Sequence, residues 1–147
     1  MALGIYTTAT PEGILSQDGS LSTPFSTTID GRTGGSREFR LYVRNNDSNY
    51  SFSGILLKPV DTEGTSIVDG TGGFNWKLRA GDAQPTTDEW DEISEGNEIG
   101  LGDLGTNVLT DISTYLPFWV KVTVPRNASV HMYTDVTLQI NATSILL

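Results

Sequence analysis

The chain has 147 residues, a net charge of −9 at neutral pH and no cysteine. Its length suits one domain with a core of its own, and the absence of cysteine excludes disulfides, thiolate metal sites and cysteine nucleophiles. Because a negative charge of this size repels phosphate backbones, nucleic acid is not an expected partner. No apolar run reaches the roughly 18 residues that a membrane helix needs, so no membrane contact is expected.

The first 24 residues are irregular and rich in Thr, Ser and Gly, and they suit either an extended arm or a first strand followed by a loop. Residues 1–6 lack the basic and apolar regions of a secretory signal, which with the absence of cysteine favours assembly in a reducing cytoplasm. We therefore divide the chain into residues 1–35, an N-terminal arm or first strand with loops, and residues 36–147, the folded domain.

Alternation of apolar and polar residues predicts three strands in the first half of the domain. In residues 38–44 the outward-facing positions are Arg40, Tyr42 and Arg44. A turn is expected at residues 45–49, because Asn and Asp hydrogen-bond their own main chain. The second strand is predicted at residues 50–58 and ends at Pro59. The third carries Phe74, Trp76 and Leu78 on one face.

One short helical turn is predicted near residues 87–94. Thr86 precedes it and Glu89 follows three residues later, which is the spacing of a capping box. Trp90 and Ile93 lie at positions i and i+3, so they anchor one turn on the same side.

The second half of the domain ends in two strands with a clear period of two. In residues 115–124, Phe118, Val120 and Val122 point to one face and Trp119 points to the other. Residues 136–140 alternate in the same way, and residues 98–101 suit a short strand. The sequence therefore predicts an all-β fold, a single antiparallel β-sandwich of about seven strands, immunoglobulin-like or jelly-roll.

No pattern in the sequence points to catalysis or to a metal. His131 is the single histidine and falls in a turn, without the second ligand or carboxylate that such chemistry recruits. Asp61, Glu63 and Asp69 surround a glycine-rich loop, but their spacing is not that of an EF-hand. The acidic residues of 88–95 share one exposed turn, whereas a glycosidase needs carboxylates that face each other. We therefore expect no enzyme activity, no cofactor and no metal.

Partner contacts are expected from exposed apolar side chains. If Phe118 and Val120 point inward, then Trp119 and Tyr42 lie on the outer face and suit contact with another subunit or a sugar. The alternative is that the strand is buried on both faces, or that loop residues cover Trp119, and the sequence leaves both open. The chain also ends in an apolar segment, which we expect to dock on the domain or on a partner: Ile145, Leu146 and Leu147.

Several segments resemble the small β-sandwich structural proteins encoded among the virion genes of tailed bacteriophages. They read Leu41-Tyr-Val-Arg-Asn45, Ile55-Leu-Leu-Lys-Pro59, Trp76-Lys-Leu-Arg79, Thr86-Thr-Asp-Glu-Trp90, Asp103-Leu-Gly-Thr106 and Tyr115-Leu-Pro-Phe-Trp-Val-Lys-Val-Thr-Val-Pro125. The likeness covers about residues 37–142 and does not include the first 35. Members of this group look like head decoration (cement) proteins or tail-associated parts, and the resemblance implies no cofactor and no catalytic residue.

These observations together lead to three functional hypotheses. The first is a non-enzymatic decoration protein that binds the outside of a phage head and stabilises contacts between major capsid subunits, as a homo-oligomer (a dimer or trimer). It is expected to be made in the cytoplasm of the bacterial host and to reside on the virion. The second is a tail, fibre or baseplate module that attaches to a host glycan. The third, a hydrolase, has the least support because no nucleophile motif accompanies the isolated histidine.

Overall fold

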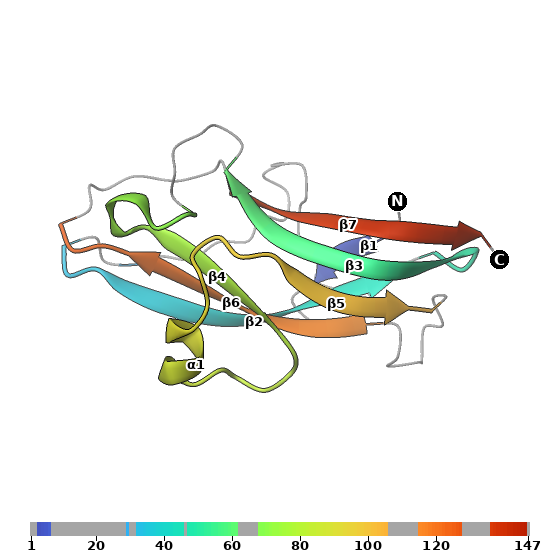
Figure 1. Ribbon diagram of the computed structural model, residues 1–147, viewed down its shortest axis with the longest axis horizontal. Helices are drawn as coiled ribbons and strands as arrows, with labels where there is room; N and C mark the ends of the chain where they lie inside the picture. Colours follow the sequence, from blue (N-terminus) through green and yellow to red (C-terminus); the bar gives the residue numbers. More distant parts are fainter. Residues whose placement is uncertain are drawn as a thin grey trace.

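The protein is a two-layer antiparallel β-sandwich with one short α-helix on the connection between its fourth and fifth strands (Figure 1). The structure is a computed structural model and describes residues 3–6, 29, 32–45, 47–61, 68–105, 115–127 and 136–146. The all-β sandwich predicted from the alternation is therefore confirmed. In these described ranges, no helix is long and apolar enough to cross a membrane.

The two sheets contain four and three of the described strands. The first has the order β1-β2-β6-β4 and the second the order β5-β3-β7, and every neighbouring pair is antiparallel. The bounds are β1 Leu3–Tyr6, β2 Gly35–Asn45, β3 Tyr50–Asp61, β4 Asn75–Ala80, β5 Ile99–Leu104, β6 Tyr115–Val124 and β7 Val136–Leu146. A 3-10 turn spans Thr71–Gly73, and the helix α1 spans Thr87–Asp91.

The strand order is close to that of a constant-type immunoglobulin sandwich. With strands numbered in chain order, one sheet of that sandwich has the order 1-2-5-4 and the other the order 3-6-7. Here β6 takes the place beside β2, and β5 instead extends the second sheet on the far side of β3. The connection from β4 to β5 therefore crosses from one sheet to the other, and it carries α1 on its way (Figure 1).

The core lies between the sheets and follows the alternation that the sequence predicts. Phe118 and Val120 of β6 and Val43 of β2 are completely buried in it, opposite Ile55 and Leu57 of β3. The remaining members of the buried cluster are Leu3, Ile5, Leu41, Phe52, Leu78, Leu104 and Val122. Residues between these positions on β2 and β6 must face away from the core, on the outer face of the first sheet.

A β-bulge in β3 changes which residues face the core. Between Ser53 and Leu56 the pairing with β7 shifts by one residue, and Gly54 adopts a φ of 59° there. The bulge lets Phe52 point inward before it and Ile55 after it, although the two are three residues apart. As a result Leu56 lies on the outer face and is 40% exposed.

The expectation that the second strand ends at Pro59 is wrong, because β3 continues to Asp61. The pairing of β3 with β5 stops at Leu57, so beyond it the described strands provide β3 with a neighbour on the β7 side only. A residue without an N–H group is tolerated at such a position, since one side of the strand has no ladder to complete.

The turn between β2 and β3 forms as the Asn-rich sequence predicts. Asn45 is fully buried, and its Oδ1 accepts a hydrogen bond from the Asp47 amide at 2.8 Å. Its Nδ2 donates to the carbonyl oxygens of Tyr50 and Gly105, at 2.8 and 2.7 Å. Asn45 therefore ties the end of β2 to the second sheet as well as closing the turn.

Candidate functional site

The outer face of the first sheet carries most of the basic residues of this acidic chain. Five of its nine Lys and Arg residues occupy outward positions on β2, β4 and β6. They are Arg40, Arg44, Lys77, Arg79 and Lys121. Aromatic residues share this face, at Tyr42 on β2 and at Tyr115 and Trp119 on β6.

The strand register places these side chains in rows across the sheet. Arg40, Trp119 and Arg79 form one row, on β2, β6 and β4. The neighbouring row contains Glu38, Lys121 and Lys77, from the same three strands in the same order. Both rows lie under the connection between β4 and β5.

The helix α1 docks on the second row through Trp90, which is 1% exposed. The indole Nε1 of Trp90 donates a hydrogen bond to a carboxylate oxygen of Glu38, and Lys77 Nζ donates to the Trp90 carbonyl oxygen at 3.1 Å. At the first row, Arg79 forms an ion pair with Glu89 of α1 at 2.6 Å. The predicted helical turn is thus present, and its tryptophan fixes it to the sheet.

The predicted capping box of α1 is also present. The Glu89 amide donates to Thr86 Oγ1 at 3.2 Å, and the Thr86 amide donates to Glu89 Oε1 at 3.0 Å. The hydrogen bond with the Thr86 backbone is the largest influence that holds the pKa of Glu89 below its usual value, and the Arg79 charge acts in the same direction. This carboxyl is therefore committed to the ionised form, unlike the catalytic acid of a glycosidase.

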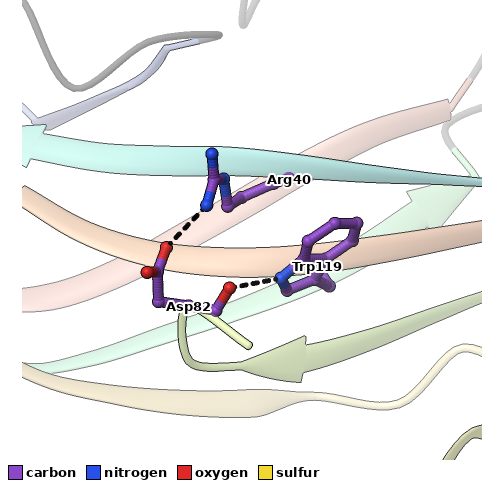
Figure 2. Close-up of polar contacts among 3 residues, drawn as sticks. All are labelled: Arg40, Asp82 and Trp119. Atoms are coloured by element: carbon purple, nitrogen blue, oxygen red, sulfur yellow. Dashed lines mark hydrogen bonds and ion pairs between the residues drawn. The ribbon is translucent and has the colours of Figure 1, made fainter. Parts of the chain in front are cut away.

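Asp82 connects the loop after β4 to the first row of the sheet (Figure 2). Its carboxylate pairs with Arg40 Nη1 at 3.0 Å, and its backbone carbonyl accepts a hydrogen bond from Trp119 Nε1 at 3.0 Å. Trp119 is half-buried. The sequence left open whether Trp119 is exposed on the outer face or is buried or covered by a loop. The loop after β4 does contact Trp119, but the side chain remains partly exposed.

Tyr42 also contacts Arg40, and it links Arg40, Asp82 and Trp119 to Tyr115. The Arg40 guanidinium lies over the Tyr42 ring, 5.7 Å from its centroid, and the rings of Tyr42 and Tyr115 meet edge to face at 5.3 Å and 83°. We call Arg40, Tyr42, Asp82, Tyr115 and Trp119 the aromatic–arginine patch. The side chains of Arg40 and Asp82 are 45% and 69% exposed, so the patch is held in place and still open to solvent.

The other end of this face is buried. Tyr6 of β1 and Arg44 of β2 are 1% and 2% exposed, although both alternate with core residues. Burial raises the pKa of the Tyr6 hydroxyl, and the positive charge of Arg44 partly opposes that effect. Arg44 therefore occupies an outward position in the strand register, as predicted, but its side chain is buried.

The structure separates the residues that we predicted as partner contacts into two places. Tyr42 and Trp119 share the aromatic–arginine patch on the first sheet. Ile145 and Leu146 belong to β7 of the second sheet, where they are 47% and 68% exposed, and Leu147 lies outside the described residues.

Three members of the patch, Arg40, Asp82 and Tyr115, were not identified from the sequence as partner contacts. The outward position of Arg40, two residues before Tyr42 in its strand, was a usable signal, because Arg and Tyr are both enriched at the energetic centres of interfaces. Asp82 gives no such signal, since it reaches Trp119 from 37 positions away in the chain.

The metal and catalytic candidates remain without structural support. His131 and Glu63 lie outside the described residues, and within the described ranges no three His, Cys, Asp or Glu side chains are grouped to hold a metal ion. In the glycine-rich loop beside these carboxylates, residues 70–73 form a tight turn, closed by a hydrogen bond from the Gly73 amide to the Gly70 carbonyl oxygen at 3.0 Å.

Comparison with known proteins adds no family. No family model, curated protein or solved structure matches this chain. The chemistry of the aromatic–arginine patch is therefore the structural basis for assigning a function.

Proposed function

We propose that this protein is a non-enzymatic structural protein of a tailed bacteriophage, which binds the outer surface of the head and stabilises contacts between major capsid subunits. The observation that carries the proposal is the aromatic–arginine patch, a partly exposed group held on a two-layer sandwich. The sequence resemblance to virion β-sandwich proteins supports the same role.

The patch has the composition of an energetic centre in a protein interface. Trp, Tyr and Arg dominate such centres, because they bury a large area and still satisfy a hydrogen bond. Here Arg40 and Trp119 are already positioned by Asp82, so binding costs little ordering of side chains. The Arg40–Asp82 ion pair is exposed and contributes little to folding, which leaves both groups available to a partner.

Binding of this kind stabilises a capsid by mass action. A protein that binds the assembled shell and not the loose subunits shifts the equilibrium towards the shell. The net charge of −9 keeps the unbound protein soluble before assembly. The major capsid protein is the partner, and the virion surface is the place of action.

The test is binding of the purified protein to heads from a phage strain that lacks its gene. The wild type is expected to saturate the heads at hundreds of copies each and to raise their resistance to heat. Arg40→Ala and Tyr42→Ala should reduce the bound amount, whereas Lys58→Ala, which removes one positive charge from the other sheet, should not. Heads that bind neither the wild type nor the control variant contradict the proposal.

A glycan-binding tail or fibre module is the second candidate. Half-buried Trp119 and Tyr42 beside the polar Arg40–Asp82 pair also suit stacking against a sugar ring. Copy number separates the two functions, because a few dozen copies found with isolated tails favour adhesion. In that case the Arg40→Ala and Tyr42→Ala variants lose binding to host cells and not to heads.

A further inference from the structure

Each sheet of a sandwich has two edges, and an unprotected edge invites another strand. Natural proteins shorten, cover, charge or distort such edges to prevent unwanted pairing. Three of the four edges formed by the described strands carry protection of this kind, and the fourth, β7, does not.

The first sheet is protected at both of its edges. β1 is only four residues long, Leu3–Tyr6, and every one of them is buried. Beside β4, the Asn97 side chain donates to the Leu78 carbonyl oxygen and accepts from the Leu78 amide, both at 2.8 Å. The backbone of Trp76 is bonded as well, to Val68 at 3.2 Å and to Gly96 at 2.7 Å. A further strand therefore has no open groups to pair with at these two positions of β4.

The β5 edge of the second sheet is irregular. β5 is six residues long, its register against β3 is interrupted twice, and Gly102 adopts a φ of 91° within it. Asp103 adds a charge, and its carboxylate accepts a hydrogen bond from the Gly54 amide at 3.0 Å. Distortion, glycine and charge together disfavour strand addition here.

Within the part of the chain that the structure describes, the β7 edge has none of these features. Its eleven residues, Val136–Leu146, contain no charged residue, no proline and no glycine, in a chain of which 18% is charged. Its pairing to β3 is regular on the β7 side, since the extra residue of the bulge belongs to β3. Gln139, Asn141, Thr143 and Ile145 are exposed at every second position. β7 is therefore a long, uncharged strand that is ready to accept a neighbour.

We infer that β7 pairs antiparallel with β7 of a second copy of this chain. The partner follows from charge, because two copies that each carry −9 can approach closely only where no acidic side chains meet, and β7 is such a strip. Pairing along the full strand places a two-fold axis at Asn141, which lies midway between Val136 and Leu146. Gln139 then faces Thr143 of the partner subunit, and both side chains donate and accept hydrogen bonds.

The resulting dimer has one continuous six-stranded sheet, in the order β5-β3-β7-β7-β3-β5. The aromatic–arginine patch lies on the other sheet, so the pairing leaves it open and presents it twice. Two patches on one rigid body bind a repeating surface more tightly than one, through effective concentration. The pairing itself does not depend on the proposed virion role and is tested on the isolated protein.

The experiment compares sedimentation equilibrium of the wild type with that of Asn141→Lys and Asn141→Asp. Asn141 is exposed, so neither variant disturbs the core, but each places two like charges face to face at the axis. We expect the wild type to dimerise, each variant alone to be monomeric, and an equal mixture of the two to dimerise again. Gln84→Lys, which adds the same charge in an exposed loop, should dimerise like the wild type.

Oxidative crosslinking gives a second readout, because the chain has no native cysteine. Asn141→Cys places the only two thiols of the dimer next to each other at the axis, and it should form a disulfide-linked dimer far faster than Gln84→Cys. A monomeric wild type, dimeric Asn141→Lys, a mixture that stays monomeric, or equal crosslinking of the two cysteine variants would each overturn the inference.

Discussion

The indole nitrogen of Trp90 in α1 donates a hydrogen bond to the carboxylate of Glu38, a residue of β2 that lies 52 positions earlier in the chain. α1 has only five residues, too few to be stable alone in water. Its position on the sheet therefore depends on the burial of Trp90 and on this bond. The same segment holds Asp82 near Arg40, so the docking of α1 and the shape of the aromatic–arginine patch are linked through one connection.

Replacing Trp90 should destabilise the domain more than any other single change on this face. Trp90→Ala removes a fully buried side chain and is expected to cost about 3–5 kcal/mol of unfolding free energy. Glu38→Ala leaves the indole N–H without its acceptor and is expected to cost about 1–3 kcal/mol. Chemical denaturation measures both, with Glu92→Gln as an exposed control. A stability of Trp90→Ala equal to that of the control would show that α1 is not anchored as described.

The Asn97 amide occupies the place of a neighbouring strand beside Leu78 of β4. Asn97→Ala removes two hydrogen bonds and is expected to lower the unfolding free energy by about 1–3 kcal/mol. It also opens the β4 edge, so we expect light scattering to detect aggregation at lower temperature than in the wild type. Asn49→Ala, in an exposed turn, is the control. Unchanged aggregation would mean that Val68 and Gly96 protect the edge without Asn97.

Two glycines with similar backbone conformations should respond differently to alanine. Gly54 has a φ of 59° and open space around an added Cβ, so Gly54→Ala is expected to cost only the left-handed conformation, about 1–2 kcal/mol. Gly34 has a φ of 69°, and an added Cβ lies 2.7 Å from the backbone nitrogen of Arg126. Gly34→Ala should therefore cost about 1–3 kcal/mol more, because the backbone itself must move. Equal thermal shifts for the two variants would contradict this difference in packing.

The sequence predicts the strands of this fold well wherever a single period of two persists. Residues 115–124 are the clearest case, since Phe118 and Val120 are buried and Trp119 is not. The prediction loses accuracy at β3. The bulge at Gly54 changes which alternate residues of this strand point into the core. No local pattern announces such a shift, since Phe52 and Ile55 are set by the pairing of β3 with both of its neighbours.

The candidate site was less predictable than the fold, because most of its contacts join distant segments. Tyr42 and Trp119 could be placed on one face from their strand positions alone. The bonds from Asp82 to Arg40 and Trp119, and the one from Trp90 to Glu38, depend on the path of the β4–β5 connection. That path follows from the order of the strands in the sheets. The periodicity of apolar residues in a sequence predicts where strands lie, but not their order.

Acid should loosen α1 before it unfolds the rest of the domain. Because the pKa of Glu89 in the fold lies below its ordinary value of 4.5, this carboxyl contributes stability that is present above that value and lost as the pH falls through the lower, folded-state pKa. Protonation weakens the capping box with Thr86 and the ion pair with Arg79. The indole N–H resonance of Trp90 in an NMR pH titration should report the change, and Glu89→Gln should keep the cap but abolish this titration. If the Trp90 resonance of Glu89→Gln moves with pH as it does in the wild type, another group controls the docking of α1.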